Sequence, residues 1–280
     1  MKNAFTIDVE DYYQVEAFAG VVDKKTWPSY ESRVENNTRR LLDLLEARAV
    51  QGTFFVLGWV AQRHRGLIQE IAARGHEIAS HGMSHTLVYT QSPQVFREET
   101  RSSKALIEDI CQRPVIGYRA ATYSITQRSL WALDILHEEG FQYDSSIFPM
   151  RHDRYGIPDA HPYPHTLRTP AGYSLAEFPI SVSRFGKFKL PVAGGGYFRL
   201  FPYALTKWGL GQINAAGHEF VFYLHPWEVD PQQPRIARAH LLSRVRHYLN
   251  LARTHPRLDR LLQDFSFTTM QDVLRTKALL

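Results

Sequence analysis

The sequence predicts an α/β fold in which about eight strands alternate with helices around a barrel. Short apolar runs rich in β-branched and aromatic residues recur along the chain, and longer stretches of helical periodicity separate them. No internal repeat, low-complexity tract or linker interrupts this alternation. Such a series is typical of βα units around a parallel sheet, so we expect one barrel domain over residues 1–280.

The expected elements follow one another in a regular order. The strands cover Ala4–Asp8, Thr53–Leu57, Glu77–Ser80, Val115–Arg119, Phe141–Ser145, Ala176–Ile180, Glu219–His225 and Phe265–Thr268. The helices cover residues 31–48, 60–73, 93–111, 127–139, 202–216, 236–252 and 270–278. Ser92 is placed as the N-cap of the third helix with Pro93 at its first position, and Gly140 ends the fourth. Residues 149–199 break the rhythm, because they are rich in Pro, Gly, Tyr and His and contain one convincing strand.

Composition excludes several classes of protein. With 44% hydrophobic and 22% charged residues the chain is globular, and its single cysteine, Cys111, rules out an internal disulfide framework. The formal charge of +5 favours polyanionic partners, but the Lys and Arg residues are spread along the chain, so we expect no nucleic-acid binding. No secretion signal and no apolar run of membrane-spanning length is evident. We therefore expect a cytoplasmic protein without a transmembrane segment.

Chemically active side chains follow the expected strands at their carboxyl ends, where the sites of βα barrels lie. The stretch "TIDVEDYY" crowds three carboxylates into four positions, which costs stability unless a cation, a shared proton or a catalytic duty compensates; a solvated turn is the alternative. The residues at these ends are Asp8, Glu10, Asp11, His81, His85, Arg119, Asp144 and His225.

His81 and His85 are four residues apart, so one turn of chain brings both imidazoles to one cation. This spacing alone also occurs by chance. With a carboxylate from the first strand, the two histidines make a metal site with open positions, which serves either a Lewis-acid hydrolase or an iron(II) oxygenase. The carboxylates precede the histidines by some seventy residues in a βα chain, which favours hydrolysis.

These residues lie in motifs that resemble the polysaccharide deacetylases of carbohydrate esterase family 4. The five family motifs have counterparts in order, namely "TIDVED", "HGMSH", "GYRAATYS", "YDSSIF" and "LHPWE". The resemblance implies a distorted (β/α) barrel of about seven to eight strands and the removal of N-acetyl groups from an amino-sugar polysaccharide or lipid-linked oligosaccharide. The opening and the "LHPWE" signature look most like the subgroup associated with exopolysaccharide export, which implies export machinery as a partner and work at the inner face of the membrane.

The resemblance also implies a role for each site residue. Asp8 would be the general base, fixed by Arg119, and His225 the general acid, with Asp144 paired to its ring. His81, His85 and a carboxylate would hold a divalent metal, expected to be Zn²⁺, with Co²⁺, Ni²⁺ or Mn²⁺ as alternatives. Implied substrate contacts are Tyr123, Ser145 and Trp227.

Two features depart from the family pattern. Val9 occupies the position of the family's metal-binding Asp and cannot ligate; since alternate residues of a strand share a side, we expect Glu10 to replace it, with Asp11 as the fallback. If neither reaches the metal, a metal-independent hydrolase of small cyclic or linear amides, or an inactive sugar-binding protein, becomes the better interpretation. The second departure is the insertion at 149–199, whose aromatic residues either stack on sugar rings in a substrate groove or belong to an ordinary packed extension. Those aromatic residues are Tyr155, Tyr163, Tyr173, Tyr197 and Phe198.

Overall fold

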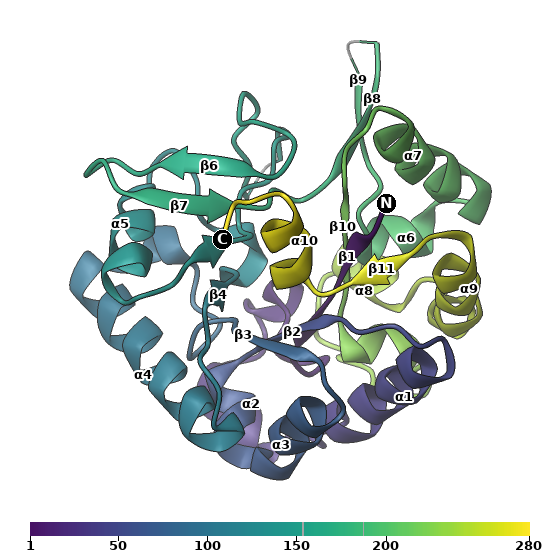
Figure 1. Ribbon diagram of the computed structural model, residues 1–280. Coiled ribbons are helices and arrows are strands. Elements are labelled where there is room, and N and C mark those ends of the chain that lie inside the picture. Colours follow the sequence, from purple (N-terminus) through teal and green to yellow (C-terminus); the bar gives the residue numbers. More distant parts are fainter. Residues whose placement is uncertain (153, 187) are drawn as a thin grey trace.

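A computed structural model describes residues 1–152, 154–186 and 188–280, and its central feature is a nine-stranded, mostly parallel sheet (Figure 1). The strand order is β10-β1-β2-β3-β4-β5-β7-β6, and β11 also pairs with β1. Among the described strands of this sheet, β6 alone runs antiparallel, against β7. The strands are β1 (Asn3–Val9), β2 (Thr53–Val56), β3 (Glu77–Ser80), β4 (Gly117–Tyr118), β5 (Tyr143–Asp144), β6 (His165–Arg168), β7 (Ser174–Glu177), β10 (Val221–Leu224) and β11 (Phe267–Thr268).

The two faces of the curled sheet carry different apolar layers. Alternate residues of each strand point to opposite sides, so Ala4 and Phe55 belong to an inner cluster while Phe5 and Phe54 pack outward against the helices. A separate antiparallel hairpin, β8 (Val182–Phe185) and β9 (Phe188–Pro191), leads into a segment whose Gly194 bridges to Tyr223 of β10. β10 is the last strand at this edge of the sheet, and the segment around Gly194 extends the barrel wall beside it.

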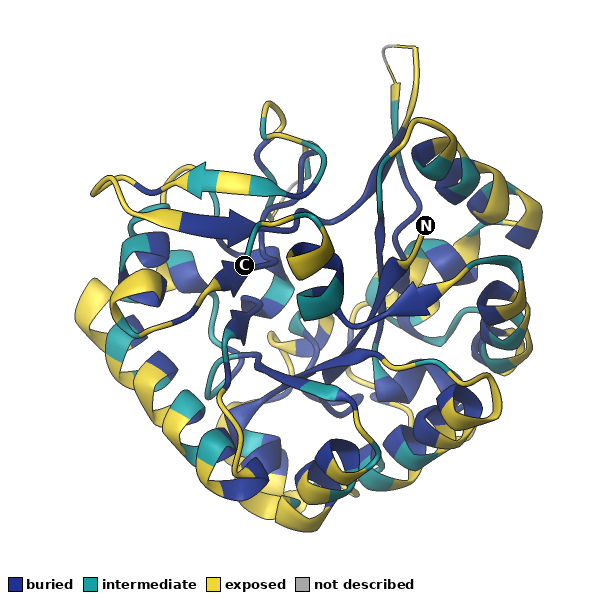
Figure 2. Ribbon diagram, viewed as in Figure 1, coloured by how far each residue is buried: buried dark blue, intermediate teal, exposed yellow. Residues whose placement is uncertain are grey.

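Helices surround the sheet and bury one face each, as Figure 2 shows by the contrast between exposed outer and buried inner surfaces. They are α1 (Val34–Ala47), α2 (Gly58–Arg63), α3 (Arg65–Ala73), α4 (Pro93–Cys111), α5 (Trp131–Glu138), α6 (Gly195–Leu200), α7 (Tyr203–Ala215), α8 (Leu241–Tyr248), α9 (Leu251–Asp264) and α10 (Met270–Thr276). Among the described residues, no helix is both long and apolar enough to cross a membrane.

Helix α10 closes one end of the barrel. Met270 and Val273 join the inner apolar cluster, and the backbone N–H of Met270 donates to Thr53 Oγ1 at the start of β2. The N–H of Gln271 donates to Glu77 Oε2 at the start of β3. The amino ends of the strands are therefore sealed, which leaves the carboxyl ends for a site.

The predicted fold class is confirmed: a curled parallel sheet surrounded by helices. All eight predicted strands exist, and Ser92 does cap α4 by accepting from the Val95 N–H. The prediction missed β6, β8, β9 and α6 inside residues 149–199, where Pro and Gly obscure the strand pattern.

The predicted helix at 236–252 was wrong. The chain forms α8 and α9 instead, separated by Asn250 in a left-handed conformation (φ 54°). Pro256 lies inside α9, as the sixth residue of that helix. The predicted helix at 60–73 is likewise divided, at His64.

Candidate active site

A cavity of about 280 Å³ opens at the carboxyl ends of the strands. Strand ends supply one wall, the 149–199 region supplies a second, and α8 supplies a third. The residues that matter below are Asp8, Glu10, His81, His85, Tyr123, His152, Arg154, Tyr155, Arg199, Tyr223, His225, Trp227, Ser243, Arg246 and His247. Five of the predicted strand-end residues thus share one cavity with residues from two regions far away in the sequence; they are Asp8, Glu10, His81, His85 and His225.

Glu10, His81 and His85 form a buried cluster whose ligand atoms all lie within 4.8 Å of one another. Glu10 follows β1 on the same side as Asp8, as the alternation of a strand requires. Glu10 Oε2 lies 2.8 Å from His85 Nε2, yet among the described residues this buried oxygen has no partner in hydrogen-bonding geometry. A cation bound between the Glu10 and His85 side chains would satisfy this buried oxygen, which otherwise has no hydrogen-bond partner among the described residues.

The charge states of the cluster also fit a cation. Burial lowers the pKa of His81 to about 4, so its imidazole is neutral near pH 7. Its Nδ1 lies 2.8 Å from the Arg119 carbonyl oxygen, which fixes the tautomer with the proton on Nδ1 and leaves Nε2 free to ligate. Burial opposes ionisation of Glu10, but His85, His225 and His81 outweigh it and lower its pKa to about 2. Two imidazoles, that of His81 neutral, and one ionised carboxylate suit Zn²⁺ or a similar divalent ion.

Asp11, the fallback ligand, points elsewhere. Its Oδ2 accepts from Ser32 Oγ at 2.7 Å and from the N–H groups of Arg33 and Val34 at 2.9 and 3.2 Å. These contacts satisfy the first turn of α1, so Asp11 anchors a helix. The fallback was therefore wrong, because one step along the chain reverses the direction of the side chain.

Asp8 and Arg119 form a buried ion pair. Arg119 Nη1 donates to Asp8 Oδ1 at 2.7 Å and to Thr6 Oγ1 at 2.8 Å. The other side of its guanidinium donates to the carbonyl and hydroxyl oxygens of Ser145. One oxygen of Asp8 is thus fixed, while Oδ2 lies 3.9 Å from His225 Nε2.

His225 faces Asp8 and Glu10 across the cavity. Its Nε2 lies 3.5 Å from Glu10 Oε1, and its Nδ1 lies 2.8 Å from Glu228 Oε1. Burial opposes protonation of His225, but the carboxylates of Glu10, Glu228 and Asp8 outweigh it and raise the pKa to about 9. The imidazole is therefore poised as a charged proton donor at neutral pH.

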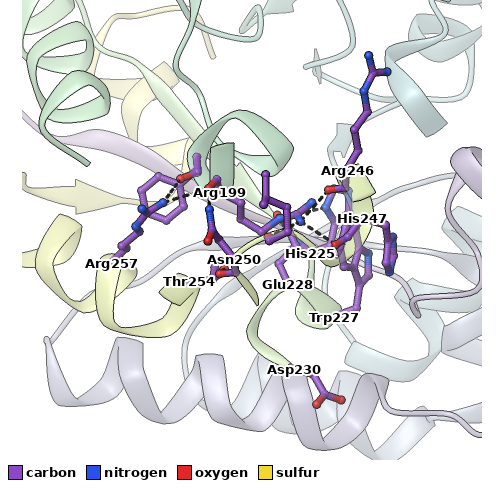
Figure 3. Close-up of polar contacts among 12 residues, drawn as sticks. Arg199, His225, Trp227, Glu228, Asp230, Arg246, His247, Asn250, Thr254 and Arg257 are labelled. Atoms are coloured by element: carbon purple, nitrogen blue, oxygen red, sulfur yellow. Dashed lines mark hydrogen bonds and ion pairs between the residues drawn. The ribbon is translucent and has the colours of Figure 1, made fainter. Parts of the chain in front are cut away.

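Glu228 is held in turn by Arg199, as Figure 3 shows. Glu228 lies three residues after His225 in the short turn η5 (Pro226–Val229), and its Oε1 also accepts from the His225 N–H. Arg199 Nε donates to Glu228 Oε2 at 2.6 Å, while Nη1 donates to the carbonyl oxygens of Arg246, His247 and Leu249. One buried arginine from α6 thus ties the support of His225 to the chain around α8.

Trp227 lies between two histidines. Its ring stacks on His225 at 5.2 Å and on His247 at 4.1 Å, and its Nε1 is 3.5 Å from Glu10 Oε1. Tyr123 also lines the cavity, in edge contact with Tyr223 and Tyr155, and has a left-handed backbone (φ 52°). Strained backbone of this kind concentrates at functional sites.

The expected pairing of Asp144 with His225 was wrong. Asp144 Oδ1 accepts from Ser146 Oγ at 2.6 Å, and the carboxylate lies against Glu177 of the neighbouring strand. Burial raises the pKa of Asp144 to about 6 and that of Glu177 well above its usual range, so this pair retains a proton. Tyr143 of β5 and Ser145, the residue after β5, face inward, so the Asp144 side chain between them points to the opposite side.

Ser145 was expected to contact substrate, but it lies outside the cavity lining. It is fully buried, accepts from Arg119 Nη2 and donates to the Phe178 carbonyl oxygen. Its position keeps Arg119 directed at Asp8.

The aromatic residues of the 149–199 region mostly lie away from the site. Tyr155 lines the cavity, but Tyr163 stacks on His218, Tyr173 stacks on His137 and Phe198 is buried in the core. The region instead contributes His152, Arg154, Gly195, Gly196 and Arg199. Sequence reasoning missed Glu228 although it stands inside "LHPWE", where a carboxylate three residues after the histidine is the available signal.

Comparisons with known proteins match different parts of the chain. Residues 21–143 match the family model "Polysaccharide deacetylase", and residues 145–275 match "Domain of unknown function (DUF3473)". A chitooligosaccharide deacetylase of Bradyrhizobium sp. strain ANU 289 is 30% identical over 99 residues, which cover 35% of this chain and 43% of that protein. The chain therefore spans less than half the length of this curated relative.

Solved structures share the fold over nearly the whole chain. A putative polysaccharide deacetylase from Mycobacterium smegmatis has a TM-score of 0.63 at 22% identity, covering 98% of this chain and 88% of that one. PuuE allantoinase has a TM-score of 0.63 at 16% identity, covering 97% and 88%. Fold likeness at this level extends to more than one kind of named protein and shows the fold alone, whereas the sequence match to the polysaccharide deacetylase model covers residues 21–143.

Proposed function

We propose that the protein is a metal-dependent hydrolase that removes N-acetyl groups from an amino-sugar polysaccharide or oligosaccharide. The observation that carries this proposal is the buried Glu10, His81 and His85 cluster, whose ligand atoms could hold a metal ion although Val9 occupies the usual ligand position. The names of the matched relatives support the acetamido sugar as substrate.

The two ends of the reaction fall to different residues. Asp8 takes a proton from the attacking water at Oδ2, because Arg119 donates to Oδ1 and holds the carboxylate in place. A divalent cation held by Glu10, His81 and His85 supplies Lewis acidity, which polarises a carbonyl group and lowers the pKa of water. The two roles require Asp8 to lie beside the cluster without belonging to it.

His225 completes the reaction as the general acid. Its Nε2 carries a proton into the cavity, and it transfers that proton to the amine nitrogen as the carbon–nitrogen bond breaks, so that acetate and a free amine leave. Glu228 holds Nδ1 and stabilises the charged ring before transfer. Trp227, stacked on the same ring, limits access of bulk water to the donor and is our candidate for a wall of the acetyl pocket.

The finer assignments are proposals as well. We infer a role in exopolysaccharide biosynthesis in the cytoplasm, at the inner face of the membrane and beside export machinery, from the resemblance of the opening motif and of "LHPWE" to that subgroup. We also infer that the 149–199 region shapes the substrate groove, since Arg154 and Tyr155 line the cavity. Zn²⁺ is the proposed metal, with Co²⁺, Ni²⁺ or Mn²⁺ as alternatives.

The decisive experiment combines metal content with product release. Purified protein is analysed for metal before and after chelation, and acetate release from N-acetylglucosamine oligomers is measured on both samples. We expect about one equivalent of a divalent ion and acetate release that chelation abolishes and zinc restores. Acetate release that survives complete removal of metal would contradict the metal-dependent mechanism and would favour the metal-independent amide hydrolases.

A further inference from the structure

The chain between Pro231 and Leu258 contains six arginines, three histidines and no Asp or Glu. The formal charge of this segment, +6, is larger than the +5 of the whole protein. The arginines are spaced apart, so the sequence shows no dense basic run, but α8 and its flanks gather several of them in one part of the structure. Arg235, Arg238 and Arg246 are exposed there, and Arg244 is partly exposed.

The same helix exposes apolar side chains. Leu241, Leu242 and Val245 of α8 are 69%, 51% and 51% exposed. Helix α6, which packs against α8, exposes Leu200 at 55%. Three apolar residues left in water on one eight-residue helix form an unpartnered face, which we call the α8 face and define by Leu241, Leu242, Val245, Arg238 and Arg244.

We propose that the α8 face docks on an anionic lipid surface. A basic amphipathic helix with exposed leucines lies in the plane of a membrane interface, where the apolar side chains enter the acyl boundary and the arginines reach anionic headgroups. A nucleic acid or an acidic polysaccharide would use the arginines but would leave the leucines in water. The apolar side chains therefore favour lipid over a purely polyanionic partner.

Docking through this face would bring the site to the membrane. Ser243, Arg246 and His247 of α8 line the cavity that holds the metal cluster, so the helix that meets lipid also forms a wall of the site. If the proposed deacetylation is correct, a saccharide carried on a lipid could enter this cavity while its lipid stays in the bilayer. This last step rests on the proposed function, whereas the docking itself does not.

The test measures co-sedimentation of the protein with vesicles of phosphatidylcholine alone and of phosphatidylcholine mixed with phosphatidylglycerol. We expect binding only to the mixed vesicles, weakening as salt rises. The double variant Leu241→Ser/Leu242→Ser should lower the partition coefficient about tenfold or more. Arg238→Gln/Arg244→Gln should lower it about fivefold for each arginine removed.

The β8–β9 hairpin offers a matched control. Its Phe185 and Phe188 are 66% and 77% exposed, and in Figure 1 the hairpin projects away from α8. Phe185→Ser/Phe188→Ser removes equally exposed apolar surface and should leave vesicle binding unchanged. Acetate release from a soluble oligomer is measured on every variant; unchanged rates show that the site is intact, so loss of vesicle binding can be assigned to the surface.

Three results would overturn the proposal. One is equal binding of all variants, and another is loss of binding in the hairpin variant alone. The third is binding that depends on the arginines but not on the leucines, matched by binding to heparin, which would identify a polyanionic polymer as the partner. None of these results bears on whether the enzyme hydrolyses acetamido sugars.

Discussion

Glu228, rather than Asp144, should control the general acid, and replacing each carboxylate by its amide separates the two. Glu228→Gln removes the charge that His225 Nδ1 and Arg199 Nε share. A hydrogen bond between charged partners contributes about 1.5–3 kcal/mol. At about 1.36 kcal/mol per tenfold in rate, kcat for acetate release should fall about 10- to 150-fold.

Asp144→Asn is the matched control. Asp144 lies outside the cavity, bonded to Ser146 and sharing a proton with Glu177, so its amide variant should keep kcat within about threefold of the wild type, a change of less than about 1 kcal/mol in the barrier. Each variant replaces one carboxylate oxygen of the wild type by NH₂, and both side chains are buried.

The pH dependence gives a second reading of the same experiment. A general acid must be protonated, so activity is lost as pH rises through its pKa. Glu228 is among the groups that raise the pKa of His225, and its replacement should therefore move the alkaline limb of the pH profile to lower pH. Urea unfolding checks that the variant is folded, since Arg199 loses its counter-charge at a cost of about 3–5 kcal/mol. A wild-type kcat and unshifted profile in Glu228→Gln, with a large loss in Asp144→Asn, would refute the assignment.

Four further predictions address the metal, the base and the stability of the fold. Glu10→Ala should lower zinc affinity by at least about 100-fold in calorimetric titration. Asp11→Ala should leave zinc affinity unchanged and should cost about 1 kcal/mol of stability, because the first turn of α1 loses its cap. The reverse pattern of zinc affinities would make Asp11 the ligand. Asp8→Asn should abolish acetate release, to below about 1% of wild type, and still bind zinc, so retained turnover would remove Asp8 from the base role. Burial lowers the pKa of His76 from 6.5 to about 4, so between these pH values the unfolded chain binds a proton that the folded protein does not. The free energy of unfolding should therefore fall by up to about 3 kcal/mol as pH drops from 6.5 to 4. His76→Gln should flatten this pH dependence in urea unfolding, and an equal slope in both proteins would exclude His76 as its cause. Gly194→Ala would make the new Cβ clash with the Tyr223 carbonyl oxygen at φ 136°, so it should destabilise the protein by several kcal/mol in the same assay. A change below about 1 kcal/mol would show that this bridge to β10 is dispensable.

The residues at the carboxyl ends of the strands could be predicted from the sequence, because the alternation of side chains along a strand determines which of them face the site. Asp8 and Glu10 lie on one side because alternate residues of β1 point the same way, and His81 follows a strand whose four residues were predicted without error. Parallel pairing then brings these ends together, as the 4.8 Å cluster requires.

The site predictions failed where the local path of the chain, rather than a regular strand, determines the direction of a side chain. The pairing of Asp144 failed because β5 has only two residues, and its inward side is taken by Tyr143 and Ser145. Glu228 reaches His225 because η5 folds back within three residues. Arg199, which binds Glu228, lies in α6, a helix that the sequence pattern did not predict. The surface on α8 depends on burial, which sequence spacing does not report.

The position of β1 constrains how the chain reaches this fold. β1 pairs with β2 nearby in sequence, but its other edge pairs with β10 through Ala4 and Val221, and with β11 through Asn3 and Phe267. Contacts between such distant residues close long loops and slow folding. During synthesis, β1 would leave the ribosome long before β10 and β11 and would wait for them with one edge unpaired. We expect this exposed edge to make newly made chains dependent on chaperones and prone to aggregate when β10 is delayed.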